Sequence, residues 1–149
     1  MLKVTAANSE DVAAIQEIYF SLRRPIRVQL DPSEYLIARV EGVVRGCAGV
    51  HLMQSAEGKE GYLYGLAVQK SFHRNGAGRA LTEARVDRVR DFGGSRAIAL
   101  AMFWNINFFR KLGFHTAPRD SLSFAIRDLS DFRDVRYRRS AVVQKSLDS

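Results

Sequence analysis

A glycine-rich run, FHRNGAGRAL, occupies residues 72–81 and follows the apolar run YLYGLAV at residues 62–68. Glycines let backbone N–H groups approach a ligand closely, because no Cβ blocks the way. The residues that follow resemble a helix, whose N-terminus favours negative charge, and Arg74 and Arg79 add two full positive charges. A strand, a glycine turn and a helix in this order predict a turn that binds phosphate. The alternative is a glycine turn that holds no ligand.

Two common phosphate-binding loops do not fit this run. A Walker loop requires Lys and then Ser or Thr after its last glycine, whereas Gly78 is followed by Arg79 and Ala80. A dinucleotide fingerprint would place glycine at the position of Leu81, and it belongs to the first strand–helix unit of its fold. A different kind of phosphate site is therefore expected.

The segments that must position this turn show, one after another, the hydrophobic spacing of strands and of helices. We expect strands within residues 2–7, 34–40, 43–54, 62–68, 96–103 and 138–147, and helices within 8–25, 78–92 and 105–112. Asn8 or Ser9 can cap the first helix and Pro25 can end it. Glu41-Gly42 is a hairpin turn that begins a three-stranded antiparallel meander. We expect one α/β domain over residues 1–149.

Composition narrows the class of protein further. The 149 residues are 46% hydrophobic and 26% charged, which is typical of one soluble domain, and no run approaches the roughly 20 apolar residues that span a bilayer. We therefore expect a cytoplasmic protein with no membrane partner. Cys47 is the only cysteine, so neither an internal disulfide nor a thiolate metal site is expected. The three histidines do not have the spacing of metal ligands, so no metal is expected. The formal net charge of +7 predicts an anionic partner, either nucleic acid, an acidic surface or a phosphorylated small molecule.

Two motifs in order resemble those of one enzyme superfamily. GLAVQKSFHRNGAGRAL resembles the acetyl-CoA signature Q/R-x-x-G-x-G/A of the GNAT N-acetyltransferases, with His73 in the Q/R position, and FFRKLGF at 108–114 resembles their F-Y-x-K-x-G-F motif. The resemblance implies a GNAT-like α/β (α+β) fold: a mixed, mostly antiparallel sheet flanked by helices, with splayed fourth and fifth strands. It implies acetyl-CoA as co-substrate and direct transfer to an amine in a ternary complex.

The resemblance also assigns roles to residues of the first motif. Backbone groups of Leu66, Ala67 and Val68 would pair with the pantetheine arm, and an N–H near Leu66 or Ala67 would hold the thioester carbonyl. The pyrophosphate would be bound by the loop residues His73, Arg74, Asn75, Gly76, Ala77, Gly78 and Arg79.

The proton-transfer groups depart from the family pattern. Phe109 replaces the tyrosine that protonates the departing thiolate, and Tyr62 stands where an acidic residue often acts as base. Tyr62 and Tyr64 are therefore the candidate catalytic residues, although strand aromatics commonly pack. Glu60 lies in a glycine-flanked loop by the same alignment, and His51 and His115 are more readily explained as strand-edge or surface residues.

The acceptor side is less determined. Trp104 and Asn105 could contact substrate, although Trp104 is also explained as a core residue. Arg85, Arg88 and Arg90 fit a solvated helix face, and FRDVRYRRS near the end is dense in arginine, yet no nucleic-acid module is recognised and nucleic-acid binding is not expected as the main function.

Three functions remain open. The junction ALAMFWNINFFRKLGF and the tail RRSAVVQKSL are similar to the amino-acid N-acetyltransferases of the N-acetylglutamate synthase type, which favours a small amine such as an amino acid. Arg24, Arg27 and Arg45 could face a carboxylate. The alternatives are a protein or peptide acetyltransferase and a non-catalytic acyl-CoA-binding or RNA-associated module. Many relatives form homodimers, so a homodimer is expected by resemblance.

Overall fold

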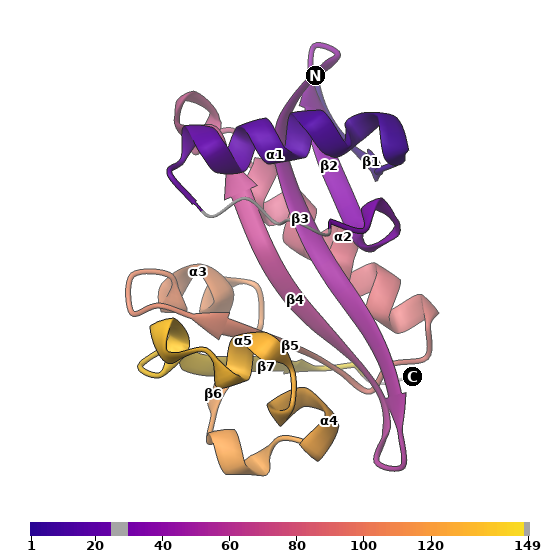
Figure 1. The fold of residues 1–149 in the computed structure, drawn as a ribbon, viewed down its shortest axis with the longest axis vertical. Helices are drawn as coiled ribbons and strands as arrows, with labels where there is room; N and C mark the ends of the chain where they lie inside the picture. Colours follow the sequence, from indigo (N-terminus) through magenta and orange to yellow (C-terminus); the bar gives the residue numbers. More distant parts are fainter. Residues whose placement is uncertain (25–29, 148–149) are drawn as a thin grey trace. The chain divides into compact units, whose positions relative to one another are not determined.

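The computed structural model describes residues 1–24 and 30–147 and consists of a seven-stranded sheet with short and long helices (Figure 1). The strands are β1 (Leu2–Ala6), β2 (Tyr35–Val40), β3 (Val43–Ser55), β4 (Gly58–Val68), β5 (Arg96–Ala101), β6 (His115–Ala117) and β7 (Ala141–Ser146). Their hydrogen-bonded order is β1-β2-β3-β4-β5-β7-β6. The pairs β1–β2, β2–β3, β5–β7 and β6–β7 are antiparallel, whereas β4 and β5 are parallel.

The helices are α1 (Val12–Ser21), α2 (Ala77–Asp91), α3 (Ile106–Lys111), α4 (Phe124–Arg127) and α5 (Ser130–Arg133). A capping box precedes α1, because the Asn8 side chain accepts from the Glu10 N–H and the Asp11 carboxylate accepts from the Asn8 N–H, each at 2.9 Å. None of the helices in the described part of the chain is long and apolar enough to cross a membrane.

The chain divides into two compact units, and strands β3 and β4 and helix α2 contribute residues to both. The first unit contains Met1–Val50 and Tyr64–Arg85, and the second contains His51–Leu63 and Val86–Ser149. The parallel register of β4 with β5 covers Gly61–Leu63 opposite Ala97–Ala99, within the second unit, whereas β4 continues to Val68.

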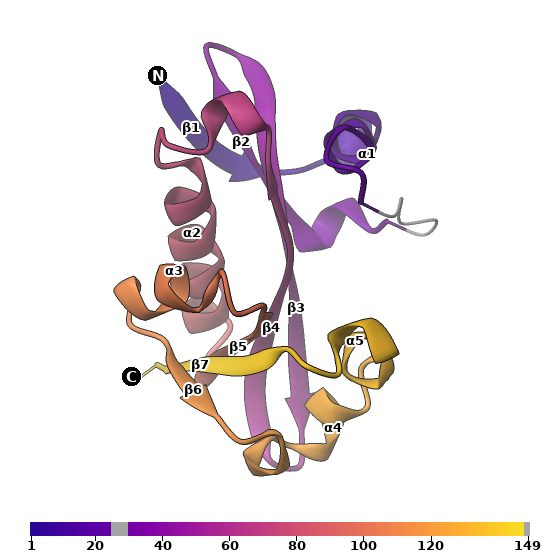
Figure 2. The ribbon, with the colours of Figure 1, turned by 90° about the vertical axis from the view of Figure 1, so that its left-hand side faces the viewer.

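In the first unit, alternate residues of the strands pack against different helices. Tyr35, Ile37, Cys47 and Ala67 pack with Ile15, Ile18 and Tyr19 of α1. Their neighbours Leu36, Ala38, Ala48 and Val68 pack with Ala77 and Leu81 of α2. This period of two places α1 and the start of α2 on opposite faces of the first unit's strands (Figure 2). Cys47 is a buried free thiol within the first of these clusters.

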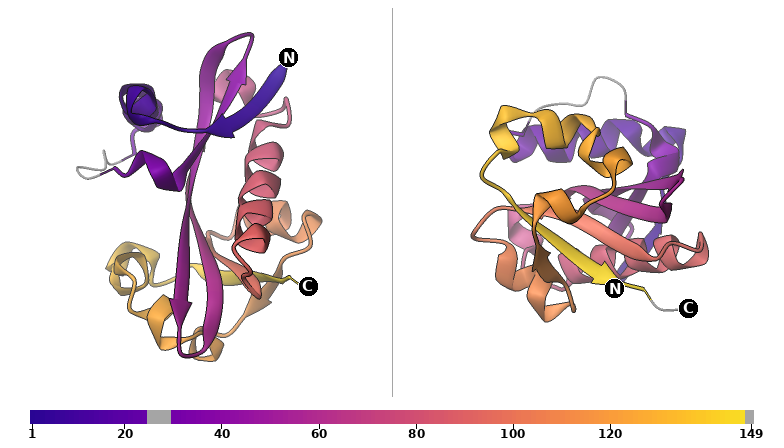
Figure 3. Two further views of the ribbon diagram at one scale, coloured as in Figure 1. Left: turned by 90° about the vertical axis from the view of Figure 1, so that its right-hand side faces the viewer. Right: turned by 90° about the horizontal axis from the view of Figure 1, so that it is seen from below.

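In the second unit, α4 and α5 lie on one face of the strands and α3 lies on the other (Figure 2). Figure 3 shows the same arrangement from the opposite side. Phe109 of α3 is buried, and its ring centroid lies 5.2 Å from that of Phe114. Ile98, Ile126 and Val143 add fully buried aliphatic side chains from β5, α4 and β7. The second unit therefore has an apolar core of its own.

Most of the expected elements are confirmed, although their bounds differ: α1 and β7 are shorter than expected, whereas β4 begins at Gly58, four residues earlier than expected. The hairpin at Glu41-Gly42 has φ values of 50° and 80°, as a turn with two left-handed residues requires. Gly93, with φ 88°, follows the end of α2. Strand β6 and helices α4 and α5 were not expected, because each has only three or four residues and too few positions to show a period. Pro25, the expected stop of the first helix, lies outside the described residues, as does Arg27.

Candidate active site

The C-terminal part of strand β4 contains a backbone irregularity. Gly65 has φ 67°, a left-handed conformation within strand β4, between Tyr64 and Leu66. The ring of Tyr64 lies over Gly49 of β3, where a Cβ would come within 2.4 Å of that ring. Glycine at these two positions therefore sets both the bend of the strand and the place of the Tyr64 side chain.

The glycine turn begins where β4 ends, as the sequence predicts. Arg74, Asn75 and Gly76 are exposed, and Gly76 has φ 87°. A Cβ added at Gly76 would meet no atom within 4 Å, so its outer side is open to a ligand. An open turn with exposed residues and one left-handed glycine, at the start of the 15-residue helix α2, fits a pyrophosphate group.

Three side chains of this turn bind neighbouring protein groups. The Nε2 atom of His73 lies 2.6 Å from the carbonyl oxygen of Val68, so the ring N–H donates back to the end of β4. The Asn75 side-chain oxygen accepts from the N–H of Ala77, the first residue of α2, at 3.2 Å. Arg79 donates to Glu83 at 2.6 Å. These contacts shape the turn, and the exposed Arg74 is its remaining cation.

Both candidate tyrosines of β4 donate their hydroxyl protons to carboxylates. Tyr64 donates to Glu34 Oε1 at 2.5 Å, within the first unit. Tyr62 is buried and donates to Asp131 at 2.8 Å, within the second unit, where its ring also lies 5.4 Å from that of Phe132. The sequence contains no signal for Glu34 or Asp131, because both partners come from distant segments. Of the two pairs, Tyr64–Glu34 shares a unit with the bend at Gly65 and with the glycine turn.

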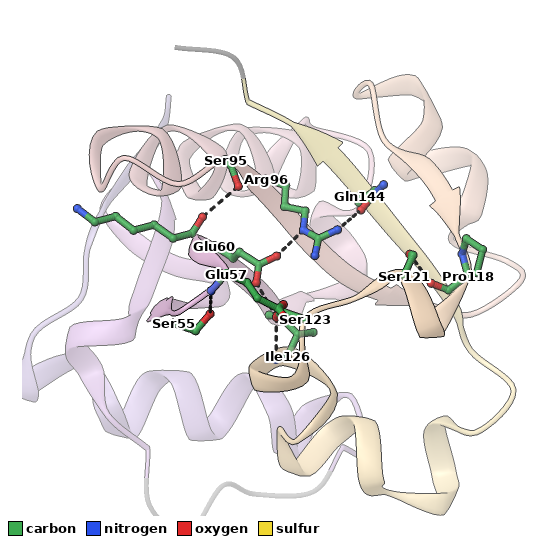
Figure 4. Close-up of polar contacts among 11 residues, drawn as sticks. Ser55, Glu57, Glu60, Ser95, Arg96, Pro118, Ser121, Ser123, Ile126 and Gln144 are labelled. Atoms are coloured by element: carbon green, nitrogen blue, oxygen red, sulfur yellow. Dashed lines mark hydrogen bonds and ion pairs between the residues drawn. The ribbon is translucent and has the colours of Figure 1, made fainter.

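The expected place of Glu60 is wrong. Glu60 lies on β4 rather than in a loop, and only 4% of it is exposed. Its carboxylate accepts from Ser123 Oγ at 2.6 Å and from Arg96 Nε, and Arg96 also donates to Gln144 at 3.0 Å (Figure 4). This network joins β4, β5, β7 and the N-cap of α4. Its geometry fits a structural role for Glu60 rather than that of a base.

Two further expectations are corrected. Arg85 does not lie on a solvated face: it is 1% exposed, and burial lowers the pKa of its guanidinium to about 10. Trp104 is not a core residue, because 65% of it is exposed next to the exposed ring of Phe103. Arg88 and Arg90 do not share the burial of Arg85, and Arg90 pairs with Asp87 at 2.9 Å. Helical spacing places Arg85 on the same face as the apolar residues Leu81 and Val89, yet the sequence gives no reason to expect an arginine to be buried with them.

The remaining candidates are placed as follows. Phe109, in the position of the family's tyrosine, packs in the second unit's core. Asn105 is the residue before α3. His51 lies on β3 and the exposed His115 on β6. Within residues 1–24 and 30–147, no group of three or more His, Cys, Asp or Glu side chains could hold a metal ion.

Comparison with known proteins identifies the family. Residues 5–114 match the model of the acetyltransferase (GNAT) family. This match covers more than half of the chain, so the chain belongs to the acetyltransferase (GNAT) family. No protein with a curated description matches the chain.

Solved structures agree with this family. N-acetylglutamate synthase from Neisseria gonorrhoeae, complexed with coenzyme A and N-acetyl-glutamate, is 27% identical, with a TM-score of 0.81 over 100% of this chain and 36% of its own. The same enzyme complexed with coenzyme A and L-arginine is 26% identical, with a TM-score of 0.82 over 99% of this chain and 34% of its own. The chain thus spans about a third of the length of that enzyme. Rv2747 from Mycobacterium tuberculosis, in complex with CoA and NLQ, has a TM-score of 0.80 at 19% identity, over 98% of this chain and 99% of its own, and shows the fold alone.

Proposed function

We propose that residues 1–149 act as one domain that transfers the acetyl group of acetyl-CoA to the primary amine of a small molecule such as an amino acid. The observation that carries the acceptor class is the likeness to N-acetylglutamate synthase, which extends over the whole of this chain. The formal net charge of +7 also suits an acceptor that carries a carboxylate. A cytoplasmic location and a homodimer stay predictions.

The cofactor side of the proposal uses the end of β4 and the turn that follows. Backbone groups of Leu66, Ala67 and Val68 would pair with the pantetheine arm, and the N–H of Leu66 or Ala67 would donate to the thioester oxygen as negative charge develops there. The loop from His73 to Arg79 would bind the pyrophosphate, mainly through the backbone and Arg74. The contact between His73 and Val68 supports a shaping role for that ring.

We assign proton acceptance to the Tyr64–Glu34 pair. The amine nitrogen attacks the carbonyl carbon, the new C–N bond forms, and the C–S bond breaks as the thiolate departs. The nitrogen loses its extra proton to the Tyr64 oxygen while the hydroxyl proton of Tyr64 moves to Glu34, across the 2.5 Å hydrogen bond. A thiolate whose conjugate acid has a pKa of about 8.5 leaves without a strong acid near pH 8, so the phenyl ring of Phe109 is tolerated.

The experiment is thiol release from acetyl-CoA across amino acids, polyamines, aminoglycosides and short peptides, with hydrolysis controls. Release that depends on one amino acid supports the proposal, whereas release with peptides alone assigns the chain to the peptide acetyltransferases. Bound acetyl-CoA without release from any acceptor would favour a non-catalytic acyl-CoA-binding module.

Matched variants test the proton route. We expect Tyr64→Phe and Glu34→Gln to lower kcat by about 10²-fold, the lower end of what general base catalysis contributes. Tyr62→Phe is the control, since it removes a hydroxyl from the same strand. Equal losses in Tyr64→Phe and Tyr62→Phe would contradict the assignment.

A further inference from the structure

Three consecutive carbonyl oxygens near the end of β4 each accept a hydrogen bond from a side chain. The donors come from α2, α1 and the segment just after α1: Arg85 Nη1 to Tyr64 O at 3.4 Å, Tyr19 Oη to Gly65 O at 2.6 Å, and Arg24 Nη1 to Leu66 O at 2.6 Å. All six residues belong to the first unit. Side chains from three different segments therefore hold the carbonyl groups of this stretch of backbone.

These contacts also determine where the next N–H groups point. A peptide group is planar and trans, so its N–H is directed opposite to its C=O. Holding the Gly65 oxygen orients the Leu66 N–H, and holding the Leu66 oxygen orients the Ala67 N–H. These two N–H groups are the ones that the proposed function places against the thioester oxygen.

The hydroxyl of Tyr19 is buried and packs tightly against the backbone of Gly65. Tyr19 is 2% exposed, and its hydroxyl also lies 3.0 Å from that of Tyr35. A Cβ at Gly65 would come within 2.4 Å of the Tyr19 oxygen, so only glycine allows the hydroxyl to reach the carbonyl. The left-handed φ of Gly65 and the buried tyrosine thus depend on each other.

The end of α1 fixes the direction of Arg24. Arg23 has φ 56°, its N–H donates to Phe20 O at 3.0 Å, and the Arg24 N–H donates to Tyr19 O at 2.9 Å. This is the hydrogen-bond pattern of a Schellman helix end, with arginine in the position usually taken by glycine. Because α1 ends in this way, Tyr19 in its last turns and Arg24 just after it both reach neighbouring carbonyls of β4.

We infer that Tyr19 is a positioning residue, which orients the Leu66 N–H toward the thioester carbonyl of acetyl-CoA, and that Arg24 does the same for the Ala67 N–H. The inference rests on the proposed acetyl transfer. Neither side chain needs to touch the substrate, because each acts through the peptide group that it holds. Their effect is therefore expected in the transition state more than in binding.

Tyr19→Phe removes one hydroxyl and tests this role, and Tyr35→Phe is the control that removes its neighbour. We expect Tyr19→Phe to lower kcat by about 10- to 100-fold, since small misplacement of groups around a reacting centre has effects of this order. The KM for acetyl-CoA should change by less than about threefold. Tyr35→Phe should keep kcat within about threefold of the wild type, because the Gly65 contact is retained.

A spectroscopic readout separates positioning from folding and from the choice of acceptor. A hydrogen bond lowers the stretching frequency of a carbonyl, so isotope-edited infrared spectra of acetyl-CoA labelled with ¹³C at the thioester should show a downshift on binding. We expect a smaller downshift in Tyr19→Phe than in the wild type or Tyr35→Phe. Should Tyr19→Phe not fold by circular dichroism, the exposed Arg24→Met provides the same test at the next peptide.

The possible results distinguish a failure of the positioning role from a failure of the proposed acetyl transfer. Equal kcat and equal downshift in Tyr19→Phe and Tyr35→Phe overturn the positioning role, even where the wild type transfers acetyl groups. A wild type that binds acetyl-CoA with no downshift overturns it as well, whereas thiol release still tests the proposed function. A wild type that does not bind acetyl-CoA overturns the proposed function and this inference with it.

Discussion

Replacing the buried Arg85 by methionine should change stability less than its four hydrogen bonds indicate. Its guanidinium donates to Leu81 O, Gly49 O, Tyr64 O and Thr82 Oγ1 at 3.0–3.4 Å. Met has a similar length but no donor, so the two strand carbonyls of Gly49 and Tyr64 lose a partner. At about 1–3 kcal/mol for each unsatisfied buried group, the loss is roughly 2–6 kcal/mol.

The opposing contribution is the cost of burying the charge. Burial lowers the pKa of Arg85 to about 10, and a fall of this size corresponds to roughly 3 kcal/mol, because one pKa unit is about 1.4 kcal/mol. The two effects are similar in size and opposite in sign. We expect the free energy of unfolding of Arg85→Met to lie within about 2 kcal/mol of the wild-type value at pH 7.5.

The pH dependence distinguishes this explanation from a simple loss of contacts. The pKa of native Arg85 is below its unfolded value, so between pH 10 and the higher pKa of an unfolded arginine the unfolded chain binds more protons than the native chain. Wild-type stability therefore rises with pH in that window, relative to Arg85→Met, by roughly 1 kcal/mol at pH 11. Below pH 10 the difference between the two proteins should be constant.

Urea unfolding followed by far-UV circular dichroism at pH 7.5, 10 and 11 measures both quantities. The control is Arg90→Met, whose arginine is partly exposed and paired with Asp87, and whose stability should follow the wild type within about 0.5 kcal/mol. A loss above about 4 kcal/mol at pH 7.5, or a difference that does not change between pH 10 and 11, would refute the reasoning.

Three further predictions concern single side chains. Gly61→Ala should lower stability by about 1–3 kcal/mol, because its Cβ would come within 2.2 Å of Val89, and a second change of Val89→Ala should restore part of the loss in thermal unfolding. Glu60→Gln should cost about 2–4 kcal/mol in urea unfolding, since it leaves Arg96 without its carboxylate; a cost below 1 kcal/mol would show that the network is not structural. Gly78→Glu should abolish acetyl-CoA binding in calorimetry by placing an anion at the proposed pyrophosphate site, and normal binding would show that the loop is misplaced.

The sequence alone determined the order of the long elements and the position of the glycine turn. Period-two and helical spacing are local properties, so the hairpin at Glu41-Gly42 and helix α2 could be predicted from neighbouring residues. Two motifs in order predicted the family, which the match over residues 5–114 bears out. Short elements such as β6 could not be predicted, because three residues carry too little pattern.

The partners of each polar side chain were decided only by the tertiary structure. Glu34 and Tyr64 are 30 residues apart, and Tyr19 and Gly65 are 46 apart, so no local pattern connects them. Charge was misleading for Arg85, because three backbone carbonyls and a hydroxyl replace the water that an arginine normally requires. Hydrophobicity was misleading for Trp104, since an exposed aromatic costs little when it stands singly or as a pair. A side chain's environment depends on contacts between distant segments, and those exist only once the chain has folded.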